Sequence, residues 1–186
     1  MRLRLIVCLL LSLFALPVLA GPREDLTAAW SKFIELESFR ADVRSAGSDN
    51  LSVRMSFRAP DRFRIEMEGA PAIIVIGNTG YMNMGAGWMS VPMPVADMTS
   101  QYRDESVLAK AAELQIEDLG EDSLDGEPVH KYRYTSPDSP KTRQTAWISR
   151  DRGYVLQIEV DSDDNEDVVI RYRDFNDPGI RIDPPR

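Results

Sequence analysis

The sequence predicts an α+β fold in which a predominantly antiparallel sheet carries its helices on one face. Apolar and polar residues alternate through short segments separated by turns that contain Gly, Asn or Pro, which is typical of about nine or ten antiparallel strands. Two other segments have apolar residues at helical spacing, one before the strands and one among them. Because an amphipathic helix and a half-apolar sheet each bury one face, we expect both helices on the same side of the sheet.

The clearest strand pair runs from residue 51 to residue 67. Apolar residues from Leu51 to Phe57 alternate with Ser and Arg, and after a corner at 59–61 the alternation resumes from Phe63 to Met67. Successive side chains of a strand point to opposite faces, so the segment predicts a hairpin with one apolar and one charged face. The apolar face has to cover either the protein's own core or a ligand.

A helix of roughly four turns is predicted before the first strand. Its apolar stripe consists of Leu26, Ala29, Trp30, Phe33 and Leu36. A second helix is predicted from Ser106 to Leu114, where the apolar residues again recur at helical spacing.

The other strands are predicted from shorter alternating or continuously apolar runs. They cover residues 39–44, 71–76, 81–84, 129–134, 144–149, 154–160, 168–172 and 180–185, and Gly85 and Gly87 mark a tight passage to Trp88 and Met89. Loops are predicted at 91–99, 137–141 and 161–167, where prolines or clustered acidic residues interrupt the pattern.

Residues 1–20 are predicted to be a secretory signal peptide rather than part of the fold. Arg2 and Arg4 precede an apolar run, and small residues lead up to a cut after Ala20. The run is shorter than the roughly 20 residues that span a bilayer, so a retained anchor is the weaker alternative. Cys8 lies inside the apolar run and is not expected to carry a lipid. Residues 21–186 are then a single domain of a periplasmic protein, expected to be soluble and to lack a membrane span.

The composition excludes several kinds of function. Cys8 is the one cysteine and leaves with the signal peptide, so disulfides and thiol chemistry are not expected in the mature protein. The formal net charge is −8, and the loss of Arg2 and Arg4 makes it more negative. A strongly acidic chain is a poor partner for nucleic acid or for anionic membrane surfaces.

The residues give little indication of catalysis, a metal site or a cofactor. His130 is the single histidine and lies within a predicted strand, away from a Ser or Asp pattern typical of a triad. A run that begins at Asp161 resembles the start of a calcium loop, but Glu166 and Tyr172 stand where such a loop needs Gly and Glu. A carboxylate-dependent hydrolase remains the weakest alternative, because Glu159 and the other strand carboxylates are expected on polar faces.

Methionines concentrate in one half of the chain. They are Met55, Met67, Met82, Met84, Met89, Met93 and Met98. Methionine is flexible and polarisable, so this enrichment suits a surface that repacks around variable ligands, with an ordinary core as the alternative.

Four segments taken together resemble the LolA family of periplasmic lipoprotein carriers and the related LppX/LprG lipid-binding proteins. They are residues 36–45, 55–67, 146–160 and 180–185. The resemblance implies an incomplete antiparallel β-barrel whose concave apolar face is covered by helices, with a cavity for acyl chains between them. It also implies a handover function, in which the lipid passes from an envelope donor to an acceptor.

The resemblance implies a set of cavity-lining residues and one residue for handover. The expected lining is Trp30, Phe33, Val53, Met55, Phe57, Phe63, Ile65, Met67, Met84, Trp88, Trp147, Leu156 and Ile158. Lipoprotein carriers of this family have a functional arginine directly before the corner proline; Ala59 stands there in this chain, and Arg58 is one residue earlier. The expected protein is a monomeric carrier of lipoprotein acyl chains or another lipid, without a cofactor, and the alternative is a non-enzymatic interaction or sensor module with the same half-barrel.

Overall fold

The computed structural model describes residues 21–45, 52–93, 111–163 and 167–185. The predicted signal peptide, residues 1–20, lies outside these ranges. The elements are α1 (Pro22–Ile34), β1 (Ser38–Ser45), β2 (Ser52–Arg58), β3 (Arg62–Met67), β4 (Ile73–Ile76), β5 (Thr79–Asn83), β6 (Trp88–Pro92), the 3₁₀ turn η1 (Ala111–Glu113), β7 (Gln115–Leu124), β8 (Glu127–Ser136), β9 (Ser139–Ser149), β10 (Val155–Ser162) and β11 (Val168–Arg173).

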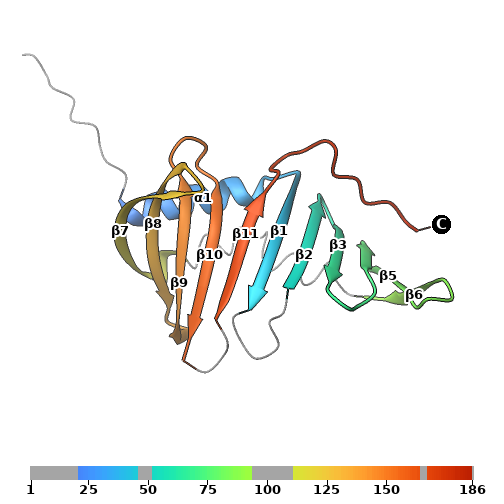
Figure 1. The fold of residues 1–186 in the computed structure, drawn as a ribbon. Coiled ribbons are helices and arrows are strands. Elements are labelled where there is room, and N and C mark those ends of the chain that lie inside the picture. Colours follow the sequence, from blue (N-terminus) through green and yellow to red (C-terminus); the bar gives the residue numbers. More distant parts are fainter. Residues whose placement is uncertain (1–20, 46–51, 94–110, 164–166, 186) are drawn as a thin grey trace, which may run out of the picture.

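The strands form a single antiparallel sheet of 11 strands in the order β6-β5-β4-β3-β2-β1-β11-β10-β9-β8-β7 (Figure 1). β6 and β7 are the two ends of this order and are not paired with each other, so the sheet is open. This is the incomplete barrel that the sequence analysis predicts. Within the described ranges, no helix combines the length and the apolar character that crossing a bilayer requires.

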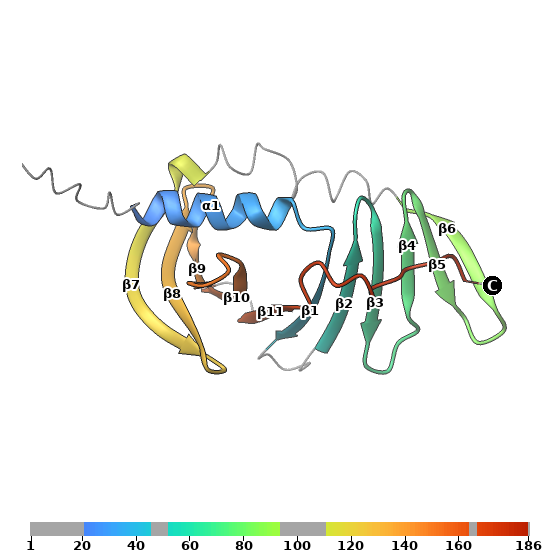
Figure 2. The ribbon, with the colours of Figure 1, turned by 90° about the horizontal axis from the view of Figure 1, so that it is seen from above.

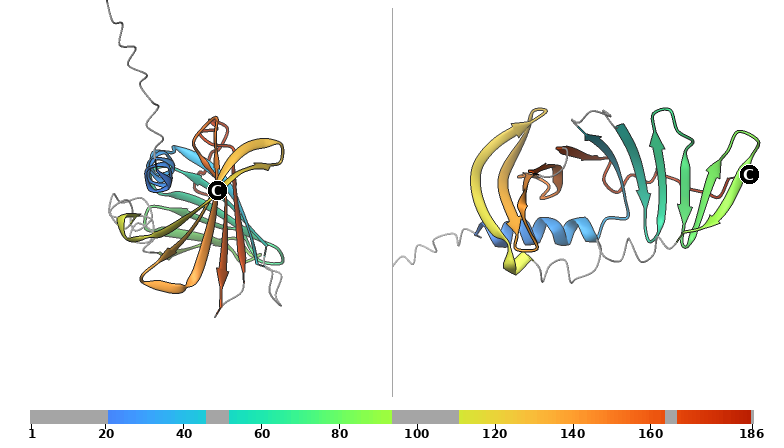
Figure 3. Two further views of the ribbon diagram at one scale, coloured as in Figure 1. Left: turned by 90° about the vertical axis from the view of Figure 1, so that its left-hand side faces the viewer. Right: turned by 90° about the horizontal axis from the view of Figure 1, so that it is seen from below.

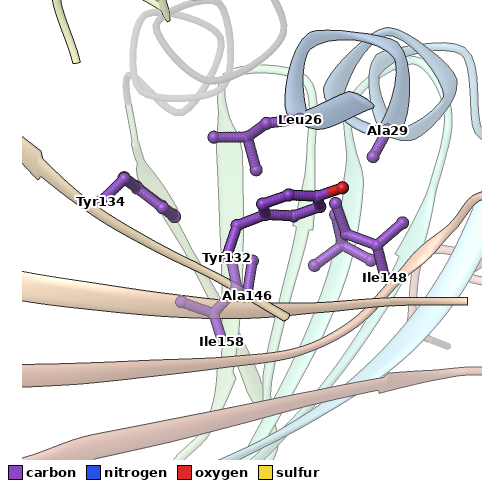
Figure 4. Close-up of a cluster of buried hydrophobic side chains, with 8 residues drawn as sticks. Leu26, Ala29, Tyr132, Tyr134, Ala146, Ile148 and Ile158 are labelled. Carbon is purple, nitrogen blue, oxygen red and sulfur yellow. The ribbon is translucent and has the colours of Figure 1, made fainter. Parts of the chain in front are cut away.

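The helix α1 covers one half of one face of the sheet. Seen from above and from below, it extends from β7 to about β1, and the strands β2–β6 continue beyond its end (Figures 2 and 3). Its residues Leu26 and Ala29 are buried against side chains of β8, β9 and β10 (Figure 4). That cluster also contains Tyr132, Tyr134, Ala146, Ile148, Val155 and Ile158.

The strand pair predicted from residues 51–67 is present as β2 and β3, with Leu51 outside the described residues. Phe57 lies opposite Phe63, and Met55 lies opposite Ile65. The alternation therefore places all the large apolar side chains of this hairpin on one face, as predicted. The peptide bond between Ala59 and Pro60 at its corner is cis.

Several predicted loops are wrong because strands continue through them. β6 extends to Pro92, which lies opposite Thr79, and β9 begins at Ser139. β10 extends to Ser162. A strand that the sequence analysis did not predict, β7, occupies 115–124, where acidic residues obscure the alternation and a bulge lies between Asp118 and Gly120.

The predicted second helix falls mostly on residues that the structure does not describe. Residues 106–110 are among these, and the next three, Ala111–Glu113, form a 3₁₀ turn rather than a helix. Leu114 has no regular structure, and β7 begins at the residue after it. The prediction of an α-helix up to Leu114 is therefore wrong for its described part.

The chain after β11 crosses the face of the sheet that is opposite α1. Ile180 and Ile182 are 3% and 4% exposed and pack against Ile74 of β4. Ser38 donates a hydrogen bond to the Asp177 carbonyl at 3.0 Å, and Arg62 donates one to the Ile182 carbonyl at 2.7 Å. The alternation of 180–185 thus corresponds to buried and exposed side chains, but the prediction of a strand here is wrong, because the segment has no regular secondary structure. Figure 1 shows it running from β11 past β1, β2 and β3.

Replacing Ile180 with alanine is expected to lower the free energy of unfolding by about 2 kcal/mol, at the lower end of the range for a buried isoleucine because a terminal segment can adjust. Urea unfolding followed by circular dichroism measures this. Arg181→Ala, one residue away and exposed, is the control and should change stability by less than about 0.5 kcal/mol. Equal stability of both variants and the wild type would show that the C-terminal segment does not contribute to the core.

Asp174 connects the C-terminal segment to β1 and β11. Its carboxylate accepts hydrogen bonds from Arg40 at 2.7 Å and from Arg173 at 2.8 Å. The hydrogen bond from Arg40, followed by that from Arg173, lowers the pKa of Asp174. A lowered pKa stabilises the fold above the unfolded-state pKa of about 3.9, and this contribution is lost as the pH falls through the folded-state value.

An Asp174→Asn variant is therefore expected to lose less stability than the wild type when the pH falls below about 4. Asn also tolerates the positive φ of 55° at this position, so the backbone need not change. Urea midpoints measured from neutral to acidic pH give the two curves. Curves that stay parallel through the acidic range would contradict the role assigned to Asp174.

Candidate functional site

The helix-side face of β1–β6 carries three rows of apolar side chains that run across the strands. The register of the strands defines them, since directly opposed residues lie on the same face. The first row is Phe39, Phe57, Phe63, Val75, Gly80 and Val91. The second is Ala41, Met55, Ile65, Ile73, Met82 and Met89, and the third is Val43, Val53 and Met67. We call this surface the apolar face.

Exposure rises along the second row with distance from α1, whereas in the first row Val75 of β4 is still 1% exposed. In the second row Ala41 is 0% exposed, Met55, Ile65, Ile73 and Met82 are half-buried, and Met89 is 48% exposed. The helix ends at Ile34, near β1, and does not extend over β3–β6 (Figure 2). The second row is therefore covered by protein at β1 and progressively exposed toward β6.

An aromatic cluster marks the end of the region that α1 covers. The Phe33 ring on α1 lies 5.0 Å from the ring of Phe39 and 5.0 Å from that of Tyr172, measured between centroids. Phe39 is 5.1 Å from Phe57, which in turn is 5.0 Å from Phe63. Rings at these separations attract one another beyond the burial of their area. The cluster forms one wall of the apolar face.

Polar contacts fix α1 over the sheet. Asp25 accepts a hydrogen bond from the Tyr132 hydroxyl at 2.6 Å, and Arg23 donates to the carbonyls of Leu114 and Ala111. Lys32, in the last turn, donates to the Arg152 carbonyl at 2.9 Å. Burial, and then the hydrogen bond to Asp25, raise the pKa of Tyr132. The tyrosine is thus a neutral donor under ordinary conditions, and the helix is attached at both of its ends.

The opposite face of the sheet, which we call the outer face, is rich in arginine. Arg58 lies on it, directly opposite Arg62 of β3, and its guanidinium is 3.9 Å from the Glu37 carboxylate. Phe57, one residue earlier, points to the apolar face. The structure therefore does not place Arg58, the predicted handover residue, on the same face as the expected lining.

The outer face also contains a pocket of about 710 Å³ over β1, β11 and β10. Three of the arginines that line it donate to carboxylates: Arg173 to Asp42 at 2.9 Å, Arg152 to Glu127, and Arg171 to Asp125. Its remaining lining includes Leu156 and Phe175. An acyl chain in this pocket would cover charged side chains, which lose hydration without gaining a partner, so the pocket suits an acyl chain less well than the apolar face does.

Most of the expected lining residues occupy the helix-side face. The hairpin residues Val53, Met55, Phe57, Phe63, Ile65 and Met67 lie together on the apolar face. Phe33 contacts them through the aromatic cluster, and Trp30 is 5.9 Å from Phe33 by ring centroids. Ile158 lies under α1 in the buried cluster of Figure 4.

Four expected lining residues lie elsewhere. Trp147 and Leu156 pack with Val129 on the outer face. For Leu156 the reason is a bulge between Val155 and Gln157, which reverses the alternation of β10, whereas Trp147 lies there by the regular register with Lys131 of β8. Trp88 packs on the outer face in the cluster of Ile180 and Ile182. Met84 lies in the β5–β6 turn and is 59% exposed. The expectation that these residues line one cavity with Ile158 is corrected.

The side chain of His130 contacts two neighbouring residues of the sheet, Asp118 and Tyr132. Its Nε2 lies 2.6 Å from Asp118 Oδ1, and its ring stacks on Tyr132 with 4.6 Å between centroids. The hydrogen bond from His130, together with the Gly120 backbone N–H, lowers the pKa of Asp118. These contacts join β7 to β8. In the described part of the chain, no three His, Cys, Asp or Glu side chains are placed to hold a metal ion.

Comparison with solved structures identifies the fold. The lipoprotein LppX of Mycobacterium tuberculosis superposes with a TM-score of 0.69 at 17% identity, over 87% of this chain and 97% of LppX. LprF of Mycobacterium bovis gives a TM-score of 0.67 at 17% identity, over 88% and 96%. MucB gives 0.55 at 15% identity, over 86% of this chain and 60% of MucB. No protein-family model and no curated protein sequence matches the chain. The chain therefore has the same fold as LppX and LprF, an open antiparallel sheet with a helix against its apolar side.

Proposed function

We propose that the protein is an extracytoplasmic carrier that shelters the acyl chains of a lipoprotein or another lipid on its apolar face and passes them to an acceptor in the envelope. The observation that supports this most strongly is the set of three apolar rows, two of which continue from β3 to β6 beyond the end of α1. Sheet faces of this size that a helix only partly covers are suited to a ligand without charge.

The flexibility of the lining fits a ligand of variable shape. Met55, Met67, Met82 and Met89 belong to the second and third rows, and methionine adapts to different neighbours at little energetic cost. The half-buried side chains of these rows have apolar area left to bury. An acyl chain with about 15 buried methylenes would gain up to roughly 12 kcal/mol at about 0.8 kcal/mol each. Association and ordering remove a large part of this gain, which leaves binding that is stable in water and still reversible.

Binding of an acyl probe to the delipidated protein tests the proposal. A polyene fatty acid, whose fluorescence rises in an apolar environment, is expected to bind saturably and to be displaced by unlabelled fatty acid. Fluorescence that rises without saturation, or that unlabelled fatty acid leaves unchanged, would count against a specific acyl site. A protein that stays folded but binds no probe would favour the alternative of an interaction module.

A further inference from the structure

One end of the sheet contains no charged residue. The 25 residues from Gly69 to Met93 include no Asp, Glu, Lys or Arg, although 28% of the chain is charged. They form β4, β5 and β6 with their connecting turns. This is the end of the sheet that lies farthest from α1 (Figure 2). We call it the charge-free end.

The exposed large hydrophobic side chains of the described residues lie on this end. They are Met84, 59% exposed, and Met89, 48% exposed, and both belong to the β5–β6 hairpin. Gly85 and Gly87 have φ of 84° and 140°, which glycine adopts without strain, so the tip between them is narrow and small. The neighbouring β3–β4 loop presents exposed Ala70 beside it. Exposed apolar side chains that lie close together and have no charged neighbours are typical of a surface that contacts a protein or a membrane.

A pocket of about 700 Å³ lies between these two loops. Its lining is Gly69, Ala70, Pro71, Ala72, Asn83, Met84, Gly85, Trp88 and Arg64. Arg64 is the charged member of this lining, and it donates to Glu66 Oε1 from Nε at 3.0 Å and from Nη2 at 2.8 Å. A guanidinium carries five N–H donors, so it can hold an anionic oxygen in addition to these two contacts.

We propose that the charge-free end docks onto the surface of a phospholipid bilayer. Met84 and Met89 enter the interfacial region, Trp88 lies at the level of the headgroups, and Arg64 contacts a lipid phosphate. Tryptophan and arginine favour these positions, whereas a buried Asp, Glu or Lys would oppose insertion. A chain whose net charge is −8 or more negative is repelled by an anionic surface, so the contact proposed here is with a bilayer of low net charge and depends on apolar burial and on Arg64.

The apolar face is continuous with the docking end. Its second row ends at Met89, so docking brings the less covered part of that face to the bilayer. The use of this contact in lipid transfer rests on the proposed carrier function, but vesicle binding itself does not require a cargo. The two can therefore be measured separately.

Flotation of the mature protein, residues 21–186, with vesicles of phosphatidylethanolamine and phosphatidylcholine, which carry no net charge, tests the docking. The wild type is expected to float with the vesicles, and the Met84→Glu/Met89→Glu double variant to bind about tenfold more weakly or less. Both positions are exposed, so the double variant should keep the circular dichroism spectrum of the wild type. Ser139→Glu is the matched control, because Ser139 is exposed at the β8–β9 turn, at the same end of the strands, and should bind like the wild type.

A wild type that does not float, or a double variant that floats equally well, would overturn the proposal. A concentration-dependent dimer that Met89→Glu disrupts, in a protein that ignores vesicles, would also overturn it and would assign the charge-free end to a second copy of the chain. Two single variants separate docking from cargo binding. Ile65→Glu should lose bound lipid and keep vesicle binding. Met84→Glu, in the β5–β6 turn and outside the three apolar rows, should bind vesicles more weakly and keep bound lipid.

Discussion

A Phe57→Ala variant is expected to lose about 3–5 kcal/mol of folding stability, the largest loss that we predict for a single side chain. Phe57 is 1% exposed and its ring lies between those of Phe39 and Phe63, at 5.1 and 5.0 Å. Removing it leaves a cavity that the neighbouring strands cannot close, because their backbone positions are fixed by hydrogen bonds on both sides of β2. Urea unfolding at neutral pH measures the loss.

Arg54→Ala provides the comparison for this variant. Arg54 is on the same strand but exposed on the outer face, and its replacement should change stability by less than about 0.5 kcal/mol. A loss below about 1 kcal/mol for Phe57→Ala would mean that this part of the sheet does not form a packed core. It would also remove the wall that the aromatic cluster gives to the apolar face.

An Ile65→Glu variant is expected to copurify with at least about tenfold less lipid than the wild type, equivalent to about 1.4 kcal/mol of binding free energy. Ile65 is half-buried in the middle of the second row, opposite Met55 and Ile73. A carboxylate at this position would have to lose water when an acyl chain covers it, and the apolar face offers it no partner. Thin-layer chromatography and phosphate analysis of extracted lipid measure the effect.

Ser56→Glu is the matched control for this change. Ser56 lies on the adjoining strand but on the outer face, opposite Arg40 and Arg64, so its carboxylate can remain solvated or form an ion pair. This variant should retain wild-type lipid content. Equal lipid content in Ile65→Glu and Ser56→Glu, with both folded, would sink the assignment of the apolar face as the binding surface.

The sequence was sufficient to predict the half of the sheet with regular alternation. From Val53 to Met67 each apolar residue is separated by a polar one, so period, face and hairpin all follow from the pattern. β7 was missed because its acidic residues hide the period and its bulge shifts it by one residue. Such a strand at the edge of the sheet is held by contacts with β8, including His130 to Asp118, that a single sequence does not reveal.

The side of the sheet was predicted correctly for the lining residues of the β2–β3 hairpin and incorrectly for Leu156 of β10. Leu156 and Ile158 are two residues apart and would share a face in a regular strand, but the bulge at Val155 places them on opposite sides. Trp88 was misassigned for another reason: both faces of this sheet are partly apolar. The C-terminal segment covers the outer face through Ile180 and Ile182, and no local pattern indicates which face Trp88 takes.

The charge-free end was accessible from the sequence, although the methionines alone did not reveal it. A run of 25 residues without a charge is visible from Gly69 to Met93. Its meaning depends on the fold, since the same run in the centre of a sheet would simply be core. The structure places the run at one end of the sheet, with Met84 and Met89 exposed, so the uncharged residues form part of the protein surface rather than its core.

The central claim, that the apolar face holds an acyl lipid, is tested most directly by mass spectrometry of lipid extracted from the protein purified from its native compartment. We predict that one or a few acyl lipids copurify in an amount comparable to that of the protein, and that Ile65→Glu lacks them. A folded wild-type protein that yields no lipid above the level of Ile65→Glu would contradict the claim.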